Sequence, residues 1–556
     1  MASTGDMLST AVSGLQAFQR NLTTIGHNIS NVNTDGYSRQ TVELSARKAN
    51  PAANGFIGTG VDITTIQRVY DQFLSNQVVS RNSAFNQQDT VQNLSNGIDE
   101  LLSNDSVGLN PVIQKFFDAM QTVANNPTSI PARQSLISEA ETLSTRFQAF
   151  DQRFSSLNDT VNQQLDVATT EVNSLATSIA EINKGIVLQT GLTGGQPPND
   201  LLDRRDHLVS QLSELVSVTT NESKDGSLNV FIGNGQSLVL GSDTQKLTTT
   251  PNEFDLSQSE VSFNTGVASF SISKQLSGGK IGGLLAFREQ VLNPTQDSMG
   301  RIAVALASNI NTQHQLGDDL NGNPGGLFFN DIVNSSPQVL PSTNNNPASG
   351  TVSVAINNTN ALQASEYRLN YDGATFSLTR LSDNSVVDSG FNAAAFPRTV
   401  ASEGITLNLA GGVAAGDSFL VRPVRNGSSD IGVAISNPAD FAGAASGNAL
   451  GDNTNALALA ALQSQNVMGG STQNFQSAYA TMVSDVGVST REARVNADAQ
   501  RTLLNRAKES QQSVSGVNLD EEAANLLKFQ QAYQAAAQVV RVSGDIFQTL
   551  LGMTGR

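Results

Sequence analysis

Residues 519–551 carry a seven-residue apolar repeat, which limits the folds open to this chain more than any other feature. Large side chains return at every seventh position: Leu519, Leu526, Tyr533, Val540 and Phe547. A second, smaller series lies between them: Ala523, Phe529, Ala536 or Ala537, Gly544 and Leu551. About five heptads of this kind predict a helix whose apolar stripe packs against other helices. The small residues favour close approach to several identical neighbours.

A matching stripe lies near the other end of the sequence. Apolar residues alternate there by threes and fours: Leu8, Val12, Leu15, Phe18, Leu22, Ile25, Ile29 and Val32. Asp35 and Gly36 form a turn signal that ends this helix. We expect the two stripes to pair with each other and with copies of the same chain. Spacing alone leaves open an ordinary antiparallel helix pair inside one globular core.

Charge and composition exclude several classes of function. The chain has 49 acidic and 32 basic residues, a net charge of −17. This balance argues against nucleic acid and against an anionic membrane surface as partners. The absence of cysteine excludes disulfides and thiolate chemistry. No run approaches about 18 apolar residues, and residues 1–20 lack the pattern of a Sec signal, so any export would use a route without Sec cleavage.

The clearest helical periodicity lies in the middle of the sequence and predicts a rod. The apolar positions are Leu136, Ala140, Leu143, Phe147, Phe150, Phe154, Leu157, Val161, Leu165, Ala168, Val172, Leu175, Ile179, Ile182 and Ile186. One extra four-residue step before Leu165 is a stutter, which relaxes left-handed supercoiling. About fifty residues at ~1.5 Å each give a rod of roughly 75 Å. We therefore expect an elongated helical domain.

Residues 322–440 differ from the rest because they are rich in Gly, Asn, Ser and Thr and contain short alternating runs. Such runs with Asp-Gly turns predict an antiparallel β domain. The expected fold is multidomain and mainly α, with terminal coiled-coil helices, an elongated helical rod and an inserted antiparallel all-β domain. The predicted parts are residues 1–65 as N-terminal axial helix and arm, 66–321 as rod with a short β segment at about 225–275, 322–444 as β insertion, 445–514 as returning rod helices, and 515–556 as C-terminal axial helix.

A search for chemical motifs gives no candidate catalytic site. The sequence has no Walker loop, no His-Glu-x-x-His and no metal cluster spacing. A calcium-loop pattern near Asp318 fails, because Gly317 and Phe328 occupy the first and twelfth ligand positions. The charged run from Asp203 to Asp206 is interpreted as a solvated ion-pair network on a helix. We expect no enzyme activity, no metal and no cofactor.

Both ends and several internal segments resemble bacterial flagellar axial proteins. The segments are SGLQAFQ at 13–19, NISNVNTDGYS at 28–38, GTGV at 58–61, IQRVYDQFL at 66–74, NDLLDRRD at 199–206, DGSLNV at 225–230, DLNGNPGGLFF at 319–329 and SGVNLDEEAANLLKFQQAY at 515–533. The terminal motifs are similar to rod, hook and hook-associated proteins alike. The internal segments and the length are similar to the hook-associated protein 1 family, which joins hook to filament.

This resemblance implies a secreted structural protein of the extracellular flagellum, exported by the type III route. It implies as partners copies of the chain, the hook protein, a second junction protein (hook-associated protein 3) and an export chaperone. It also implies that the chaperone binds the C-terminal helix, at Leu526, Phe529, Tyr533, Val540 and Phe547. The candidate self-assembly residues are Leu8, Val12, Leu15, Phe18, Leu22, Ile25, Asn28, Ile29, Asn31, Asn33, Gly36, Tyr37, Asn518, Leu519, Leu526, Phe529, Gln530, Tyr533, Ala537, Val540 and Phe547.

Two other readings stay open from the sequence. Within the same class, the chain could be a hook or distal-rod axial protein. From a different class, residues 322–440 could be an adhesin or glycan-binding module carried on an axial scaffold. A hydrolase carried on such a scaffold is a third idea, but no acidic or metal constellation in the sequence supports it.

Overall fold

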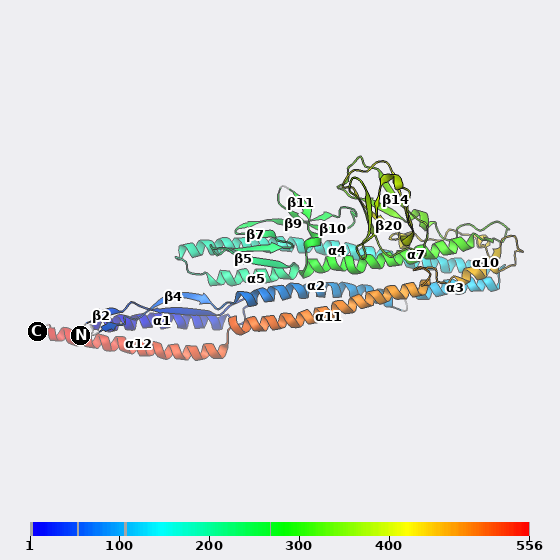
Figure 1. The fold of residues 1–556 in the computed structure, drawn as a ribbon. Coiled ribbons are helices and arrows are strands. Elements are labelled where there is room, and N and C mark those ends of the chain that lie inside the picture. Colours follow the sequence, from blue (N-terminus) through cyan, green and yellow to red (C-terminus); the bar gives the residue numbers. More distant parts are fainter. Residues whose placement is uncertain (1–3, 53–54, 105–107, 267, 555–556) are drawn as a thin grey trace.

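The computed structural model describes residues 4–52, 55–104, 108–266 and 268–554. The molecule is elongated, with a bundle of long helices, sheets on one side of it, and a pair of terminal helices projecting from one end (Figure 1). The predicted segments 1–65 and 515–556 include a few residues outside the described ranges.

The rod is centred on α4 (Ile130–Leu192), a helix of 63 residues. At ~1.5 Å per residue it is roughly 95 Å long. Its predicted core positions are buried almost throughout, Leu143, Phe147 and Val172 completely so. Ser129 caps its N-terminus by accepting a hydrogen bond from the Ala132 N–H, and Thr193 follows its last turn.

Other long helices run beside α4 and complete the rod (Figure 1). They are α2 (Gln72–Ser103), α3 (Asn110–Asn125), α5 (Asn199–Leu215), α6 (Gly279–Phe287), α7 (Asn293–His314), α10 (Thr454–Ala461) and α11 (Phe475–Ser515). Helices α2 and α11 pair along most of their length, and α2 also contacts α5 and α6. The rod is therefore built from segments on both sides of the β-rich region in the sequence.

Two small antiparallel sheets lie on α4. One contains β5 (Val218–Glu222), β6 (Leu228–Ile232), β7 (Gln236–Leu240) and β8 (Asp243–Thr244); the other contains β9 (Lys246–Pro251), β10 (Ser259–Asn264) and β11 (Ser269–Ser271). Asn183 and Asn173 of α4 each bond both the N–H and the C=O of one strand residue, Leu228 and Leu247. These two amides hold the sheets to the helix as a neighbouring strand would.

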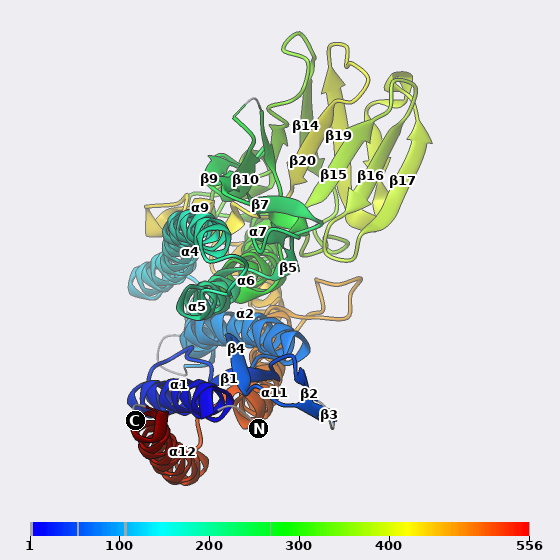
Figure 2. The same cartoon turned by 90° about the vertical axis from the view of Figure 1, so that its left-hand side faces the viewer.

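A larger β region projects sideways from the rod (Figure 2). Its strands are β13 (Gln338–Pro341), β14 (Thr351–Ile356), β15 (Tyr367–Tyr371), β16 (Phe376–Arg380), β17 (Ser385–Phe391), β18 (Arg398–Val400), β19 (Ile405–Ala410) and β20 (Ser418–Arg422). They form a five-stranded sheet ordered β13-β20-β15-β16-β17 and a three-stranded sheet ordered β14-β19-β18. The first and last strands pair directly, Gln338 opposite Arg422, so the chain enters and leaves at one place.

The terminal layer contains α1 (Thr4–Ser30), α12 (Leu519–Thr554) and a hairpin. The two helices run antiparallel beside each other and bring both chain ends to one end of the molecule (Figure 1). The hairpin pairs β1 (Gln40–Ala46) with β4 (Val61–Arg68), and β2 (Asn50–Ala52) pairs with β3 (Gly55–Ile57). Gly36 has a φ of +79° and turns the chain after α1.

Candidate assembly interface at the chain termini

Helix α1 has a buried face made of small and polar residues, which packs on the β1–β4 hairpin. Its buried residues include Ala11, Ser13, Ala17, Asn21, Thr24 and Asn28. The Ser13 hydroxyl accepts a hydrogen bond from the Val61 N–H at 3.2 Å. A side chain at Gly60 would overlap Ser13, and Gly60 has a φ of +106°. Small residues therefore let helix and hairpin approach closely.

The predicted apolar stripe of α1 lies on a different side and is only partly covered. Leu8 and Val12 are exposed, at 41% and 38% of their surface. Leu15, Phe18 and Leu22 are half-buried. Phe18 meets Phe529 of α12 with ring centroids 6.2 Å apart, so α12 covers part of this stripe and leaves the rest open.

Helix α12 turns a mostly small and polar face inward. Glu522 and Ser543 are buried, both 3% exposed, and Phe529 and Ala536 are half-buried. The large heptad residues are less covered: Leu519, Leu526, Tyr533 and Phe547 are exposed and Val540 is half-buried, and Val542 and Ile546 outside that series are exposed as well. An exposed apolar face of this length marks an interaction surface.

The structure distributes the candidate self-assembly residues over three environments. Buried residues are Ile25 and Asn28; half-buried residues are Leu15, Phe18, Leu22, Ile29, Asn31, Tyr37, Phe529 and Val540; exposed residues are Leu8, Val12, Asn33, Gly36, Asn518, Leu519, Leu526, Gln530, Tyr533, Ala537 and Phe547. The chain thus brings Phe18 and Phe529 together and leaves Leu519, Leu526, Tyr533 and Phe547 of α12 exposed.

Asn28 connects four segments at the base of the terminal layer. Its Oδ1 accepts hydrogen bonds from the Tyr37 hydroxyl at 2.7 Å and the Gln40 N–H at 2.9 Å. Its Nδ2 donates to the Gln40 carbonyl at 3.0 Å and to the Glu522 carboxylate at 3.2 Å. The amide uses its full hydrogen-bonding capacity while only 1% of the residue is exposed. This candidate self-assembly residue therefore joins α1, the turn at Tyr37, the hairpin and α12.

A charged cluster docks the hairpin onto α5 of the rod. The Asp203 carboxylate accepts from the Ser38 N–H and from Arg68, both at 3.0 Å. Arg68 also binds Asp206 at 2.7 Å and lies over the Tyr70 ring. Asp203 is 6% exposed. The interpretation of this run as a solvated network was wrong for Asp203 and Arg205, which are buried, whereas Arg204 is exposed and Asp206 is half-buried.

Burial sets the protonation of two of these groups. Burial raises the pKa of Tyr37, and the carboxylates of Asp203 and Asp200 raise it further, so the hydroxyl keeps the proton that it donates to Asn28. Burial also raises the pKa of Asp203, against the opposing effects of the Ser38 N–H and Arg68.

A third link ties the same region to the C-terminal segment. Arg39 forms an ion pair with Glu521 at 2.8 Å, and its N–H donates to the Ser515 carbonyl at 2.8 Å. We call the set Asn28, Tyr37, Ser38, Arg39, Gln40, Arg68, Asp203, Asp206, Glu521 and Glu522 the junction cluster. It joins the terminal layer to the rod. Sequence reasoning missed Gln40, Arg68 and Glu522, because no local pattern shows that such separated residues meet.

Within the described parts of the chain, no three His, Asp or Glu side chains gather as a metal ion would require. Among the described helices, none has the length and apolar character needed to cross a membrane.

Known proteins similar to this chain match it over almost its whole length. The model described as "Flagellar hook-associated protein FlgK helical domain" matches residues 95–329, and "Flagellar hook-associated protein 1, D2-like domain" matches 340–423. Flagellar hook-associated protein 1 of Salmonella typhimurium is 35% identical over 98% of this chain and 99% of the relative. The chain belongs to the flagellar hook-associated protein 1 family. It is a component of the flagellar axial structure.

Further members of the family support the same assignment. Hook-associated protein 1 of Escherichia coli K12 is also 35% identical over 98% of this chain and 99% of its own, and that of Bacillus subtilis is 26% identical over 100% and 99%. A solved structure of the flagellar hook junction protein FlgK from Burkholderia pseudomallei has a TM-score of 0.73 and 27% identity, covering 79% of this chain and 100% of that one. Membership in the hook-associated protein 1 family resolves the choice against a hook or distal-rod protein, which the terminal motifs alone leave open.

The matches also follow the structural parts. "Flagella basal body rod protein" matches residues 8–37, and "Flagellar basal body rod FlgEFG protein C-terminal" matches 510–553. These two ranges contain most of α1 and α12. In this hook-associated protein 1 family member, the terminal layer is thus the part shared in type with rod proteins, while the family's own models match α3 to α7 of the rod and most of the β region.

Proposed function

We propose that this chain is a non-enzymatic structural subunit of the hook–filament junction in the extracellular flagellum, and that it assembles with its own copies through α1 and α12. The observation that carries the proposal is the contrast within one molecule. Core positions of α4 are buried by the chain itself, whereas Leu526, Tyr533 and Phe547 of α12 stay 36%, 38% and 54% exposed. Apolar side chains held on a helix at this exposure favour burial by neighbouring subunits.

Head-to-tail contacts between identical subunits generate rings or open helical assemblies, and both suit an axial structure. We propose the hook protein and hook-associated protein 3 as the neighbours on either side of the assembled subunits, on the strength of the family assignment. The adhesin reading receives no support from the family.

An export chaperone is a further proposed partner, which would cover α12 before assembly. Of its five proposed contact residues, Leu526, Tyr533 and Phe547 are exposed and Val540 is half-buried. Phe529 instead contacts Phe18. A chaperone that uses Phe529 would therefore have to compete with α1 for the same face of α12.

We propose the division into parts that the sequence suggests, with the β region as an inserted all-β domain at 322–444. The direct pairing of β13 with β20 supports an insertion, since both ends of the region leave the rod side by side. The pairing of α2 with α11 supports a rod that residues 66–321 begin and 445–514 complete. The contact between α1 and α12 supports an axial layer of 1–65 and 515–556.

Deleting residues 519–556 tests the assembly role. We expect a soluble protein with a folded rod and β region that no longer joins the flagellar axial structure, because the exposed face of α12 is gone. Incorporation is scored by motility and by filament attachment in a strain that lacks its own copy of the protein.

A point substitution tests the exposed face of α12 while leaving the helix itself in place. Tyr533→Asp places a charge on that face, and Val495→Asp places one at a 57%-exposed apolar position of α11 as the matched control. Failure of Tyr533→Asp alone supports the proposal. Normal attachment by both the deletion and Tyr533→Asp would disprove it.

A further inference from the structure

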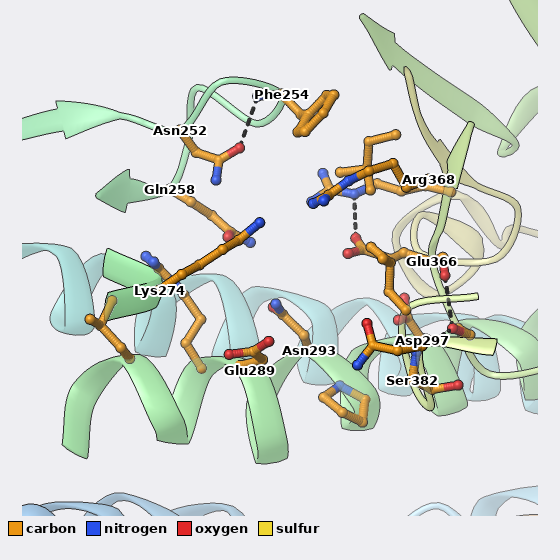
Figure 3. A pocket seen from close by; sticks show the side chains of 18 of the residues that line it. Asn252, Phe254, Gln258, Lys274, Glu289, Asn293, Asp297, Glu366, Arg368 and Ser382 are labelled. Atoms are coloured by element: carbon orange, nitrogen blue, oxygen red, sulfur yellow. Dashed lines mark hydrogen bonds and ion pairs between the residues drawn. The ribbon is translucent and has the colours of Figure 1, made fainter. Parts of the chain in front are cut away.

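A cavity of about 340 Å³ lies where three parts of the molecule meet. Its walls come from the β9–β10 sheet, from the segment joining α6 to α7, and from the β domain around β15 and β20. Its volume falls within the range of small-molecule sites. Figure 3 shows polar side chains from all three parts converging on it.

Most charges around this cavity are already neutralised by near neighbours. Glu260 binds Arg288 at 3.4 Å, and Asp297 binds Arg425 at 2.6 Å. Glu366 accepts from Arg422 and lies 2.9 Å from Arg425. These pairs close the walls and fix the orientation of the β domain on the rod.

Two positively charged side chains that line the cavity are not neutralised in this way. Lys274 and Arg368 form no side-chain hydrogen bond or ion pair within the part of the chain that the structure describes, and the buried Nε of Arg368 lacks an acceptor. The Arg368 guanidinium lies over the Phe254 ring, 5.5 Å from its centroid, which holds it in place. In Figure 3, Lys274 reaches across the cavity towards Gln258, and Arg368 enters from the opposite side.

Gln258 adds an unused amide. The residue is only 9% exposed, yet its side chain has no partner among the described residues while it lines the cavity. Its Oε1 and Nε2 are open to the cavity rather than buried without a partner. An acceptor and donor inside the cavity would satisfy it.

The helix beneath the cavity is widened at this point. Residues Arg288–Leu292 form a π-helical turn, in which the Asn293 N–H donates to the Arg288 carbonyl five residues earlier. Pro294 favours this turn because it has no N–H to donate to the preceding helix. Such turns occur often at functional sites. This one aligns Glu289 and Asn293 along the cavity floor.

We propose that this cavity binds a sugar acid, a small polyhydroxylated molecule with one carboxylate. Lys274 and Arg368 neutralise the carboxylate, while Gln258, Asn293 and Glu289 bind hydroxyl groups. Phe254 is buried beneath Arg368 and offers no open ring for a neutral sugar to stack on. The net charge of −17 does not prevent an anion from binding here, since charges beyond about 8 Å are screened at physiological salt. The proposal is independent of the role of α12.

Calorimetric titration of the full chain with D-glucuronate tests it, with D-glucose, acetate and inorganic phosphate as comparison ligands. We expect glucuronate to bind at least tenfold more tightly than each of them. Tighter or equal binding of acetate or phosphate would show a general anion site, or one that accepts an acidic side chain of another protein, and would overturn the proposal. So would the absence of glucuronate binding.

Variants locate the binding. Lys274→Met should weaken glucuronate binding at least tenfold without affecting the fold, because this side chain is exposed. Gln258→Leu should weaken it several-fold. The matched control is Lys246→Met, an exposed lysine of β9 outside the cavity, which should leave binding within twofold of the parent. Equal losses for Lys274→Met and Lys246→Met would mean non-specific electrostatic attraction and would contradict the site.

Discussion

Helices α4 and α12 have the same kind of sequence pattern and very different surroundings. Both are long, and both repeat apolar residues at three- and four-residue steps. In α4, Leu143 is 0% exposed and Phe150 is 2% exposed. In α12, Leu526 is 36% exposed and Phe547 is 54% exposed. In both helices the repeat predicts an apolar face. In α4 other segments of the same chain cover that face, whereas in α12 they cover only part of it.

The difference comes from what lies beside each helix. Helix α4 contacts α3, α5, α6, α7 and both small sheets, so its apolar stripe is enclosed, while Val167 and Leu188 outside the stripe stay exposed. Helix α12 contacts α1 along one side, and that contact uses Phe529 and small residues. The chain thus places its larger α12 side chains away from its own core.

Truncating one phenylalanine in each helix gives the largest expected effect. Phe147→Ala in α4 should lower the free energy of unfolding of the rod by about 3–5 kcal/mol, because it leaves a cavity in a closed core. Phe547→Ala should change it by less than about 0.5 kcal/mol. Chemical denaturation of the full chain, followed by circular dichroism, measures both.

Assembly should reverse this order. Phe547→Ala should reduce incorporation into the axial structure, and Phe147→Ala should affect it only through loss of folded protein. A strong destabilisation of the isolated chain by Phe547→Ala would show that α12 is enclosed within the monomer and would remove the contrast.

Two asparagines of the terminal layer, one buried and one less so, allow a similar comparison of substitution effects. Asn28→Ala should cost about 1–3 kcal/mol, because it leaves the N–H and C=O of Gln40 without their partner in a buried place. Asn31→Ala should be nearly neutral, since Asn31 is only half-buried and its side chain bonds only within its own turn. Hydrogen exchange at the Gln40 amide reports the opening directly. Equal exchange rates in the two variants would contradict the role given to Asn28.

The smallest expected effect is a pH dependence in the rod. His314 is fully buried; its Nε2 accepts from the Ala442 N–H at 2.9 Å, so Nδ1 carries the proton and donates to the Gly326 carbonyl at 2.8 Å. Burial lowers the pKa of His314. Its contribution to stability is therefore complete above the unfolded pKa of about 6.5 and decreases as the pH falls from there towards the lowered folded value.

Thermal melting between pH 7.5 and 5 tests this prediction. The melting temperature should fall more for the parent than for His314→Gln, which has no ring to protonate. His27→Gln, at an exposed position of the terminal layer, is the control and should follow the parent. Identical pH profiles for all three proteins would show that His314 does not titrate differently on folding.

Much of the fold is visible in the sequence because local periodicity reports it. Positions such as Leu143, Phe154 and Ile179 follow one stripe, and this stripe is enclosed in the rod. Alternation in residues 351–356 and 367–371 likewise coincides with strands. Where one face is buried along a regular element, a single segment contains enough information to predict both the element and its inner side.

The junction cluster was not predictable in this way. The polar sequence around Asp203 predicts a surface charge. Its burial depends on Ser38 and Arg68, which are more than 130 residues away in sequence. Similarly, the inner face of α12 follows Glu522 and Phe529 rather than the larger heptad series. Local patterns record what a helix prefers to bury, while the choice among possible partners depends on contacts between distant segments.

The direct pairing of β13 with β20 has a consequence for how this molecule can change. Because the β region is attached by two adjacent strands, loops between them that do not contact the rod can be shortened, lengthened or replaced while the attachment keeps its geometry; Glu366, which pairs with Arg422 and Arg425, has to stay. These loops lie far from α1 and α12 (Figure 2). The loops can therefore vary in length and sequence without changing the assembly surface proposed on α1 and α12.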